Sequence, residues 1–254
     1  MPAVFIGHGS PMNTLENNRF TQAWHDFGRS IPRPRAILAV SAHWYVNATA
    51  VTAMEQPKTI HDFFGFPDEL FAVQYCAPGS PELAERVVSA LSPVWVGRDI
   101  DSWGLDHGTW SVLAHMFPDA DVPVVQLSID ATKSFAEHLN LGSGLAPLRE
   151  EGVLVLCSGN VVHNLRRIDW ATTEGGYDWA VEFDAHVRAA MTDDPSALAY
   201  AESHPAYALA SPTPDHFIPV LYAAGLAAAS GHGAETLTGG CVMGSLSMTS
   251  FVVR

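Results

Sequence analysis

The chain has 254 residues, of which 48% are hydrophobic and 16% charged, a globular composition with enough apolar material for a core. Its 27 acidic and 13 basic residues give a formal net charge of −14, which disfavours nucleic acid and anionic membranes as partners. The longest apolar stretch, near Leu221–Ala229, is far shorter than the roughly 20 residues of a membrane-spanning helix. The N-terminus lacks the pattern of a signal peptide, and three scattered cysteines indicate a reducing cytoplasm.

Short apolar runs alternate along the chain with stretches that have a helical pattern. In chain order we expect a strand at Ala3–Ile6, a helix at Glu16–Phe27, strands at Arg35–Ser41 and Ala48–Met54, helices at Pro81–Leu91 and His107–Phe117, a strand at Pro123–Ile129, a helix at Ser134–Leu148, a strand at Gly152–Cys157, helices at Tyr177–Met191 and Phe217–Ala229, and a final strand at Leu246–Val253. Most of these strands are apolar on both faces. The sequence therefore predicts an α/β fold, one domain over residues 1–254, whose central and mostly parallel sheet is flanked by helices on both faces. The alternating final strand is expected at an edge.

Histidine is unusually frequent, with 12 residues against 13 lysines and arginines together. His8 directly follows the first expected strand, His43 follows the second, and His163 follows the Gly152–Cys157 strand. The carboxyl ends of parallel strands form the edge at which open α/β sheets bind ligands. His216, at the start of the late helix, is in a position to join them. We therefore expect these four side chains to converge at that edge.

Convergent imidazoles suit a borderline divalent metal such as Zn²⁺ or Fe²⁺, and three protein ligands leave positions open for a substrate. The fourth histidine is then either a further ligand or a proton-transfer group, and spacing alone does not decide between these roles. A single histidine in a glycine loop is commonly only a hydrogen-bonded turn residue. Their shared placement at strand ends favours the functional interpretation.

The remaining histidines carry weaker signals. His107, in Gly104-Leu105-Asp106-His107-Gly108, is equally well read as a site residue or as the start of a helix. His25, His138 and His186 lie in expected helices among charged neighbours and are expected on the surface.

The segment His61–Pro67 holds three phenylalanines between a histidine and a proline. It is either an apolar wall for a flat aromatic ligand or an irregular loop that is anchored in the core. Phosphate-loop, dinucleotide-binding and serine-hydrolase motifs are absent from the sequence.

Five motifs, in this order, resemble the 4,5-DOPA extradiol dioxygenase group of the class III extradiol ring-cleaving dioxygenases. They are Gly7-His8-Gly9-Ser10-Pro11, Ser41-Ala42-His43-Trp44, Gly104-Leu105-Asp106-His107-Gly108-Thr109-Trp110, Gly159-Asn160-Val161-Val162-His163-Asn164-Leu165 and Pro214-Asp215-His216-Phe217. The resemblance extends over nearly the whole chain. It also implies an α/β fold with one central sheet, and it specifies the family far better than the substrate.

The resemblance implies a metal held by His8, His43 and His216, where His216 takes the place of the glutamate of the protocatechuate branch. It implies that His163 is the catalytic acid and base, close enough to the metal to be counted as a ligand. It implies that His107 is a further catalytic residue, which either supports a metal ligand from behind or contacts the substrate. The implied activity is the insertion of both atoms of O₂ into a catechol beside its diol, with Fe²⁺ as the catalytic metal and Zn²⁺ as a readily bound one. The alternatives are a zinc hydrolase and a non-catalytic metal-containing binding protein. We expect a cytoplasmic monomer or small homo-oligomer.

Overall fold

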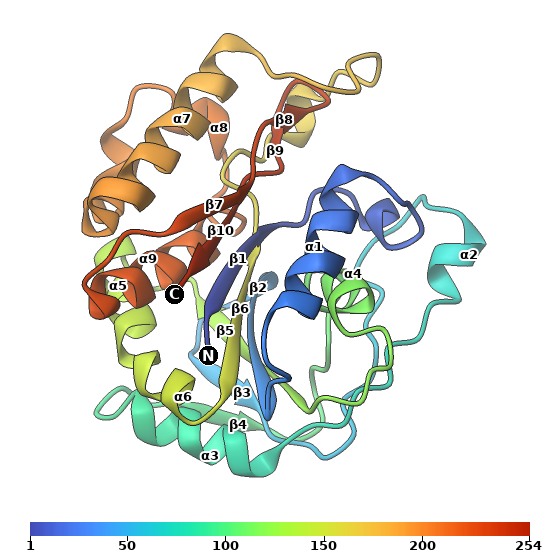
Figure 1. Ribbon diagram of the computed structural model, residues 1–254, viewed down its shortest axis with the longest axis vertical. Helices are drawn as coiled ribbons and strands as arrows, with labels where there is room; N and C mark the ends of the chain where they lie inside the picture. The colour runs from blue at the N-terminus through green and yellow to red at the C-terminus, as the bar shows by residue number, and fades with distance from the viewer.

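The computed structural model describes residues 1–254 and contains one large sheet (Figure 1). Its strands are β1 (Ala3–Gly7), β2 (Ala36–Val46), β3 (Ala50–Thr52), β4 (Gly97–Asp99), β5 (Val124–Asp130), β6 (Val153–Gly159), β7 (Glu235–Thr238) and β10 (Ser250–Val253). They lie in the order β4-β3-β5-β2-β6-β1-β10-β7. The central pairs β5–β2, β2–β6 and β6–β1 are parallel, whereas β10 pairs antiparallel with both β1 and β7. The predicted mostly parallel sheet is confirmed.

Helices cover both faces of this sheet, as predicted (Figure 1). The helices are α1 (Arg19–Ser30), α2 (Asp68–Phe71), α3 (Pro81–Ala90), α4 (His107–Met116), α5 (Phe135–Gly144), α6 (Ala146–Glu150), α7 (Asp178–Asp193), α8 (Tyr207–Ala210) and α9 (Ile218–Ser230), with 3-10 turns at Pro11–Thr14, Leu165–Arg167 and Pro195–Ser203. Alternate side chains of β1 enter different cores: Phe5 packs with α5, α7 and α9, whereas Val4 and Ile6 pack with α1 and α4. No helix has both the length and the apolarity needed to cross a membrane.

Strand β2 is longer than predicted, and this corrects the expected position of His43. The strand continues to Val46, so that His43 lies inside it rather than after it. Trp44, Tyr45 and Val46 are residues that favour strands. The pairing of β2 with β5 shifts register between Val40 and Tyr45, and His43 lies in this irregular stretch. An irregularity of this kind can re-aim a side chain without ending the strand.

The C-terminal strand differs from the prediction in two ways. Leu246–Val253 divides into β9 (Leu246–Ser247), which pairs with β8 (Cys241–Val242), and β10. Strand β10 is not an edge strand, because β7 covers its outer side. β7 has the sequence Glu-Thr-Leu-Thr, which is too short and too polar to be recognised as a strand.

The segment Ser134–Leu148 also departs from the expected single helix. It forms α5 and then α6, and Pro147 lies in the first turn of α6. Proline is tolerated at the start of a helix and not in its interior, so the break at Leu145 follows from its position.

The expected surface position of His138 is wrong, because the side chain is 0% exposed. It lies on α5 where this helix packs against α9, and its Nδ1 is 3.2 Å from the hydroxyl of Tyr222.

Candidate metal centre

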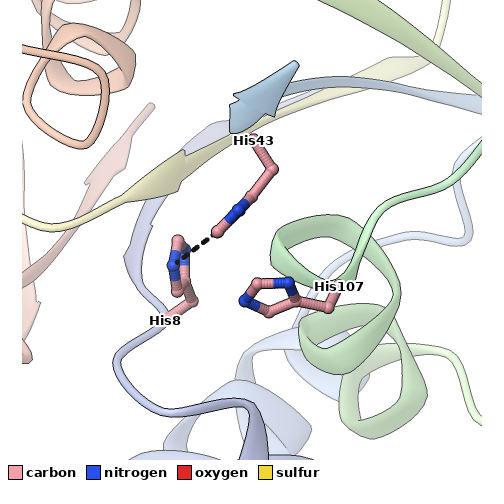
Figure 2. Close-up of side chains that lie close together, drawn as sticks. All are labelled: His8, His43 and His107. Atoms are coloured by element: carbon pink, nitrogen blue, oxygen red, sulfur yellow. Dashed lines mark hydrogen bonds between the residues drawn. The ribbon is translucent and has the colours of Figure 1, made fainter. Parts of the chain in front are cut away.

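Five histidine rings come together at the carboxyl edge of the central strands. His8 follows β1 directly, His43 lies near the end of β2, His107 begins α4, His163 follows β6, and His216 precedes α9. The four histidines predicted to converge do so, and His107 joins them. Figure 2 shows His8, His43 and His107 pointing toward one another. Candidate ligand atoms of these three residues all lie within 4.8 Å of one another.

The spacing of the rings distinguishes two possible sets of three metal ligands: His8 and His43 with either His216 or His107. The ring centroids of His8, His43 and His216 form a nearly equal triangle, at 5.2 Å, 5.4 Å and 5.0 Å. His107 is placed less evenly, because its ring centroid is 3.9 Å from that of His43 and 5.9 Å from that of His8. His163 stacks on His216 at 3.5 Å and is parallel to it within 1°.

Strand register and two glycines allow these rings to approach. In the parallel ladders, Gly7 of β1 lies opposite Gly159 of β6, so the residues that follow both strands meet at one edge. A Cβ on Gly159 would lie 2.3 Å from the carbonyl oxygen of His216. A Cβ on Gly108 would lie 2.8 Å from the Cδ2 atom of His43. Any residue larger than glycine at position 108 would displace His43, and any at position 159 would displace His216.

The tautomer of His8 follows from its neighbour on β6. The hydroxyl of Ser158 lies 2.6 Å from the carbonyl oxygen of Gly108, to which it donates its only hydrogen. His8 Nδ1 lies 2.9 Å from the same hydroxyl oxygen and must therefore donate to it. The Nε2 atom of His8 is then a lone-pair donor, and it lies 3.3 Å from Nε2 of His43.

Carboxylates select the same tautomer in the other three rings with polar partners. Nδ1 of His43 and Nδ1 of His107 each lie 2.9 Å from an oxygen of Asp62. Nδ1 of His216 is hydrogen-bonded to Asp215. An ionised carboxylate only accepts hydrogen bonds, so each Nδ1 carries the hydrogen and each Nε2 is free.

These residues fit a divalent metal ion on the chemistry of the donor set. Two Nε2 lone pairs that face each other at 3.3 Å repel unless a proton or a cation lies between them. In metal-binding histidines the other ring nitrogen typically donates to a carboxylate, a carbonyl or another polar group, which fixes the ring and its tautomer. His8, His43, His107 and His216 all have this arrangement, and the site can therefore hold a metal.

Burial keeps most of the rings neutral. Burial, followed by the charge of neighbouring histidines, lowers the pKa of His8 and of His216 well below the usual value. Burial also lowers the pKa of His163 to about 4. Burial opposes protonation of His43 too, but the hydrogen bond that His43 donates to Asp62 and the negative charges of Asp106, Asp62 and Asp215 together outweigh burial, and the pKa of His43 is raised.

An aromatic wall borders the centre on the side of His107. The ring of Phe63 meets His107 edge to face at 5.4 Å and contacts Phe66 and Phe71. Phe64, the next residue, is 92% exposed. The loop therefore has both characters that the sequence left open, since Phe63 faces the site and Phe63 and Phe66 pack against the core, whereas Phe64 faces solvent.

Three polar residues of the centre were missed as site residues in the sequence. Asp215 and Ser158 adjoin predicted features, namely His216 and the loop that carries His163, and could have been found from this proximity. Asp62 lies 45 positions from His107 in an irregular loop. Its place inside the His61–Pro67 aromatic segment was its only sequence signal.

The comparisons with known proteins agree with this fold and site. The family described as the catalytic LigB subunit of aromatic ring-opening dioxygenase matches residues 2–253. A 4,5-DOPA dioxygenase extradiol of Escherichia coli (strain K12) is 49% identical, with 98% of this chain and 93% of that protein covered. A 4,5-DOPA dioxygenase extradiol of Beta vulgaris is 38% identical, over 88% of this chain and 85% of that protein. A crystal structure of an uncharacterized Escherichia coli K12 protein matches with a TM-score of 0.88 and 44% identity, over all of both chains.

The chain belongs to the family of the catalytic LigB subunit of aromatic ring-opening dioxygenases. Within that family it is an extradiol ring-cleaving dioxygenase, an oxidoreductase that acts on a small aromatic substrate and O₂. The resemblance stated from the five motifs is confirmed.

Proposed function

We propose that the chain opens the ring of a DOPA-like catechol beside its diol, with His8, His43 and His216 holding Fe²⁺. Residues 1–254 act as one catalytic domain, which the family match over residues 2–253 supports. The observation that carries the proposal is the nearly equal triangle of three imidazoles, each with its Nδ1 bound to a polar side chain.

The ring spacing favours His216 over His107 as the third ligand. A nitrogen ligand about 2.1 Å from a metal has its ring centre about 3.2 Å from the ion, so rings at tetrahedral or octahedral angles have centres roughly 4.6 to 5.3 Å apart. His216 meets this spacing with both His8 and His43 to within a few tenths of an ångström. The 3.9 Å between the rings of His107 and His43 is too short for two ligands of one ion. His107 is then free to contact the substrate.

His163 is the acid and base of the reaction in this proposal. Its backbone N–H is anchored on the carbonyl of Ala210, while its ring stacks against His216. Neither ring nitrogen has a protein partner, so both are available to a substrate. The neutral ring accepts a phenolic proton from the bound catechol, and it returns a proton later in the reaction. His107 accepts a hydrogen bond from the substrate at its free Nε2 and thereby orients the substrate ring.

The bound metal supplies the electron transfer between an aromatic diol and O₂ that protein side chains cannot provide. The chain itself supplies the remaining requirements. It presents neutral nitrogen ligands, a proton acceptor beside them, and an apolar wall led by Phe63 against which a flat ring can pack. The buried surroundings strengthen each of these interactions.

The substrate class rests on the relatives. Proteins named 4,5-DOPA dioxygenase extradiol are 34% to 49% identical to this chain and cover 88% to 98% of it. We propose a cytoplasmic location as well, which the three free cysteines support, and a monomer or small homo-oligomer.

The test uses metal-free protein that is refilled anaerobically with Fe²⁺ or, in parallel, with Zn²⁺. L-DOPA and simple catechols are added, and O₂ uptake is recorded. Uptake with Fe²⁺ only, together with a yellow ring-opened product, supports the proposal, because Zn²⁺ does not exchange electrons. Absence of uptake with every catechol at confirmed iron occupancy would contradict it.

A further inference from the structure

We propose that Asp62 is the positioning residue of the centre: its one carboxylate holds His43 and His107 in the tautomer that turns a free Nε2 inward. The inference rests on the proposed function, since it makes the metal affinity of His43 and the substrate contact of His107 depend on the same side chain. Neither the family description nor the five motifs includes Asp62.

The two carboxylate oxygens of Asp62 accept hydrogen bonds from different histidines. Oδ2 accepts from Nδ1 of His43 at 2.9 Å. Oδ1 accepts from Nδ1 of His107 at 2.9 Å and from the backbone N–H of His107 at 3.0 Å. The side chain of Asp62 is only 18% exposed, so water competes little for these oxygens. All three donors are satisfied by one ionised carboxylate, without a hydrogen on the carboxylate itself.

The loop that carries Asp62 is fixed independently on both sides. The indole N–H of Trp110 donates to the carbonyl of Ile60 at 2.8 Å. His61 Nε2 bonds the carbonyl of Val73 at 2.9 Å, and the ring of Phe63 rests against His107. The loop therefore does not depend on the carboxylate alone, and the carboxyl group can be altered with these anchors in place.

An asparagine at position 62 cannot replace the carboxylate. Its single carbonyl oxygen is best placed toward His107, where it can accept from both the backbone N–H and Nδ1. The NH₂ group of the asparagine then faces Nδ1 of His43. To accept from that NH₂ group, His43 must move its own hydrogen to Nε2. An Nε2 that carries hydrogen has no lone pair for a metal. Asp62→Asn thus removes one ligand through a tautomer change, with almost no change in side-chain volume.

The test compares Zn²⁺ affinity, measured by calorimetry on metal-free protein, for the wild type, Asp62→Asn and Asp130→Asn. Asp130 is a matched control, because its carboxylate, at the end of β5, is also buried and is bonded to Thr49, Thr132 and Lys133 and to no histidine side chain. We expect Asp62→Asn to weaken Zn²⁺ binding by 10- to 100-fold, as typical of lost outer partners of metal-bound histidines, and Asp130→Asn to leave it within twofold. Equal affinities of wild type and Asp62→Asn would overturn the proposal.

A second measurement needs no variant. Long-range ¹H–¹⁵N spectra of metal-free wild-type protein distinguish the two neutral tautomers of each histidine. The proposal predicts hydrogen on Nδ1 of both His43 and His107, and hydrogen on Nδ1 of His107 only in Asp62→Asn. A wild-type spectrum with His107 or His43 lacking hydrogen on Nδ1 would overturn it. Failure of the wild type to bind any metal would refute the proposed function, whereas the spectra would still decide the role of Asp62.

Discussion

The ring of His163 lies flat against the ring of His216, with centroids 3.5 Å apart and planes 1° from parallel. Stacking fixes the orientation of His163 without using either of its nitrogens. A proton-transfer group requires this combination, because a nitrogen that is already bonded to the protein is not available to a substrate. The contact also places the acid and base of the proposed reaction directly beside a proposed ligand.

The contact predicts a separation of binding from turnover in His163→Phe. Phenylalanine keeps the stacked ring and removes the nitrogens, so we expect metal affinity to change by less than a few fold. We expect kcat for catechol cleavage to fall by roughly 10²- to 10⁴-fold, the usual contribution of a positioned proton-transfer group. Steady-state O₂ uptake at confirmed iron occupancy measures this, with His232→Phe in an exposed loop as the control. Retained kcat would remove His163 from the mechanism.

The choice between His216 and His107 as third ligand predicts opposite behaviour of two alanine variants. His216→Ala removes a ligand, and we expect its metal content after dialysis to fall well below stoichiometric. His107→Ala removes only a substrate contact, so it should retain metal and show a raised KM or a lowered kcat. Metal analysis of both purified variants decides the question. Full metal content in His216→Ala together with loss in His107→Ala would assign the third ligand to His107.

Close packing predicts that Gly108→Ala disturbs the centre. The added Cβ would lie 2.5 Å from the hydroxyl oxygen of Ser41 and 2.8 Å from Cδ2 of His43, so His43 must move. Overpacking of this kind costs about 1 to 3 kcal/mol, and here the displaced ring is also a proposed ligand. We expect a lower melting temperature and weaker metal binding. Gly144→Ala, where the nearest atom is a leucine methyl at 3.3 Å, is the control and should alter neither by more than a small amount.

The burial of the His138 side chain predicts that the folded protein loses stability in mild acid. Burial lowers its pKa from 6.5 to about 4, and its Nε2 has no hydrogen-bond partner. Between these values the unfolded chain binds a proton that the folded chain does not bind, so stability falls as the pH falls through this window. The contribution at pH 5 is about 2 kcal/mol.

The variant His138→Leu isolates this effect. At pH 7.5 it should be less stable than the wild type, by about 1 kcal/mol, because the Tyr222 hydroxyl loses its partner. At pH 5 the order should reverse, because leucine does not titrate. Urea unfolding at both pH values measures the difference. A stability difference that does not change with pH would show that His138 is not the titrating group.

The sheet and most of the histidine cluster could be predicted because both follow from local rules. Apolar runs identify the central strands, and strand ends of a parallel sheet meet at one edge, which brings His8 and His163 together. His216 joins them from the start of α9, as expected from its place before the late helix. His43 reached the same edge for a different reason, since β2 continues through it and changes register there. The conclusion was right although the assumed strand end was wrong.

The residues that were missed depend on contacts distant in sequence. Asp62 reaches His43 and His107 from an irregular loop with no periodicity, and nothing local distinguishes its carboxylate from those of solvent-exposed loops. His138 was misplaced because charged neighbours along α5 suggested a surface position, whereas the packing of α5 on α9 buries that side of the helix. Short polar β7 is a strand only because β10 offers it a partner.

Carboxylates add negative charge around this all-histidine centre. Imidazole ligands carry no negative charge of their own, but carboxylates contact Nδ1 of two of the three. Asp62 contacts His43, and Asp215 contacts His216. A glutamate ligand would place its negative charge directly on the metal. Here the negative charge lies on carboxylates that contact the histidine ligands and not the metal itself. The acidic partners still favour a cation at the centre, and they leave the ligand nitrogens uncharged.

The central claim is that both atoms of O₂ enter a catechol at this histidine site. Its most direct test is turnover of L-DOPA or a simpler catechol under ¹⁸O₂ by the iron-loaded protein, with immediate reduction of the product, because aldehyde oxygen exchanges with water. Mass spectrometry should show two ¹⁸O atoms in one product opened beside the diol, and His163→Phe at equal iron content should form almost none. A product that carries one ¹⁸O atom or none, or that is opened between the two hydroxyl-bearing carbons, would contradict the account.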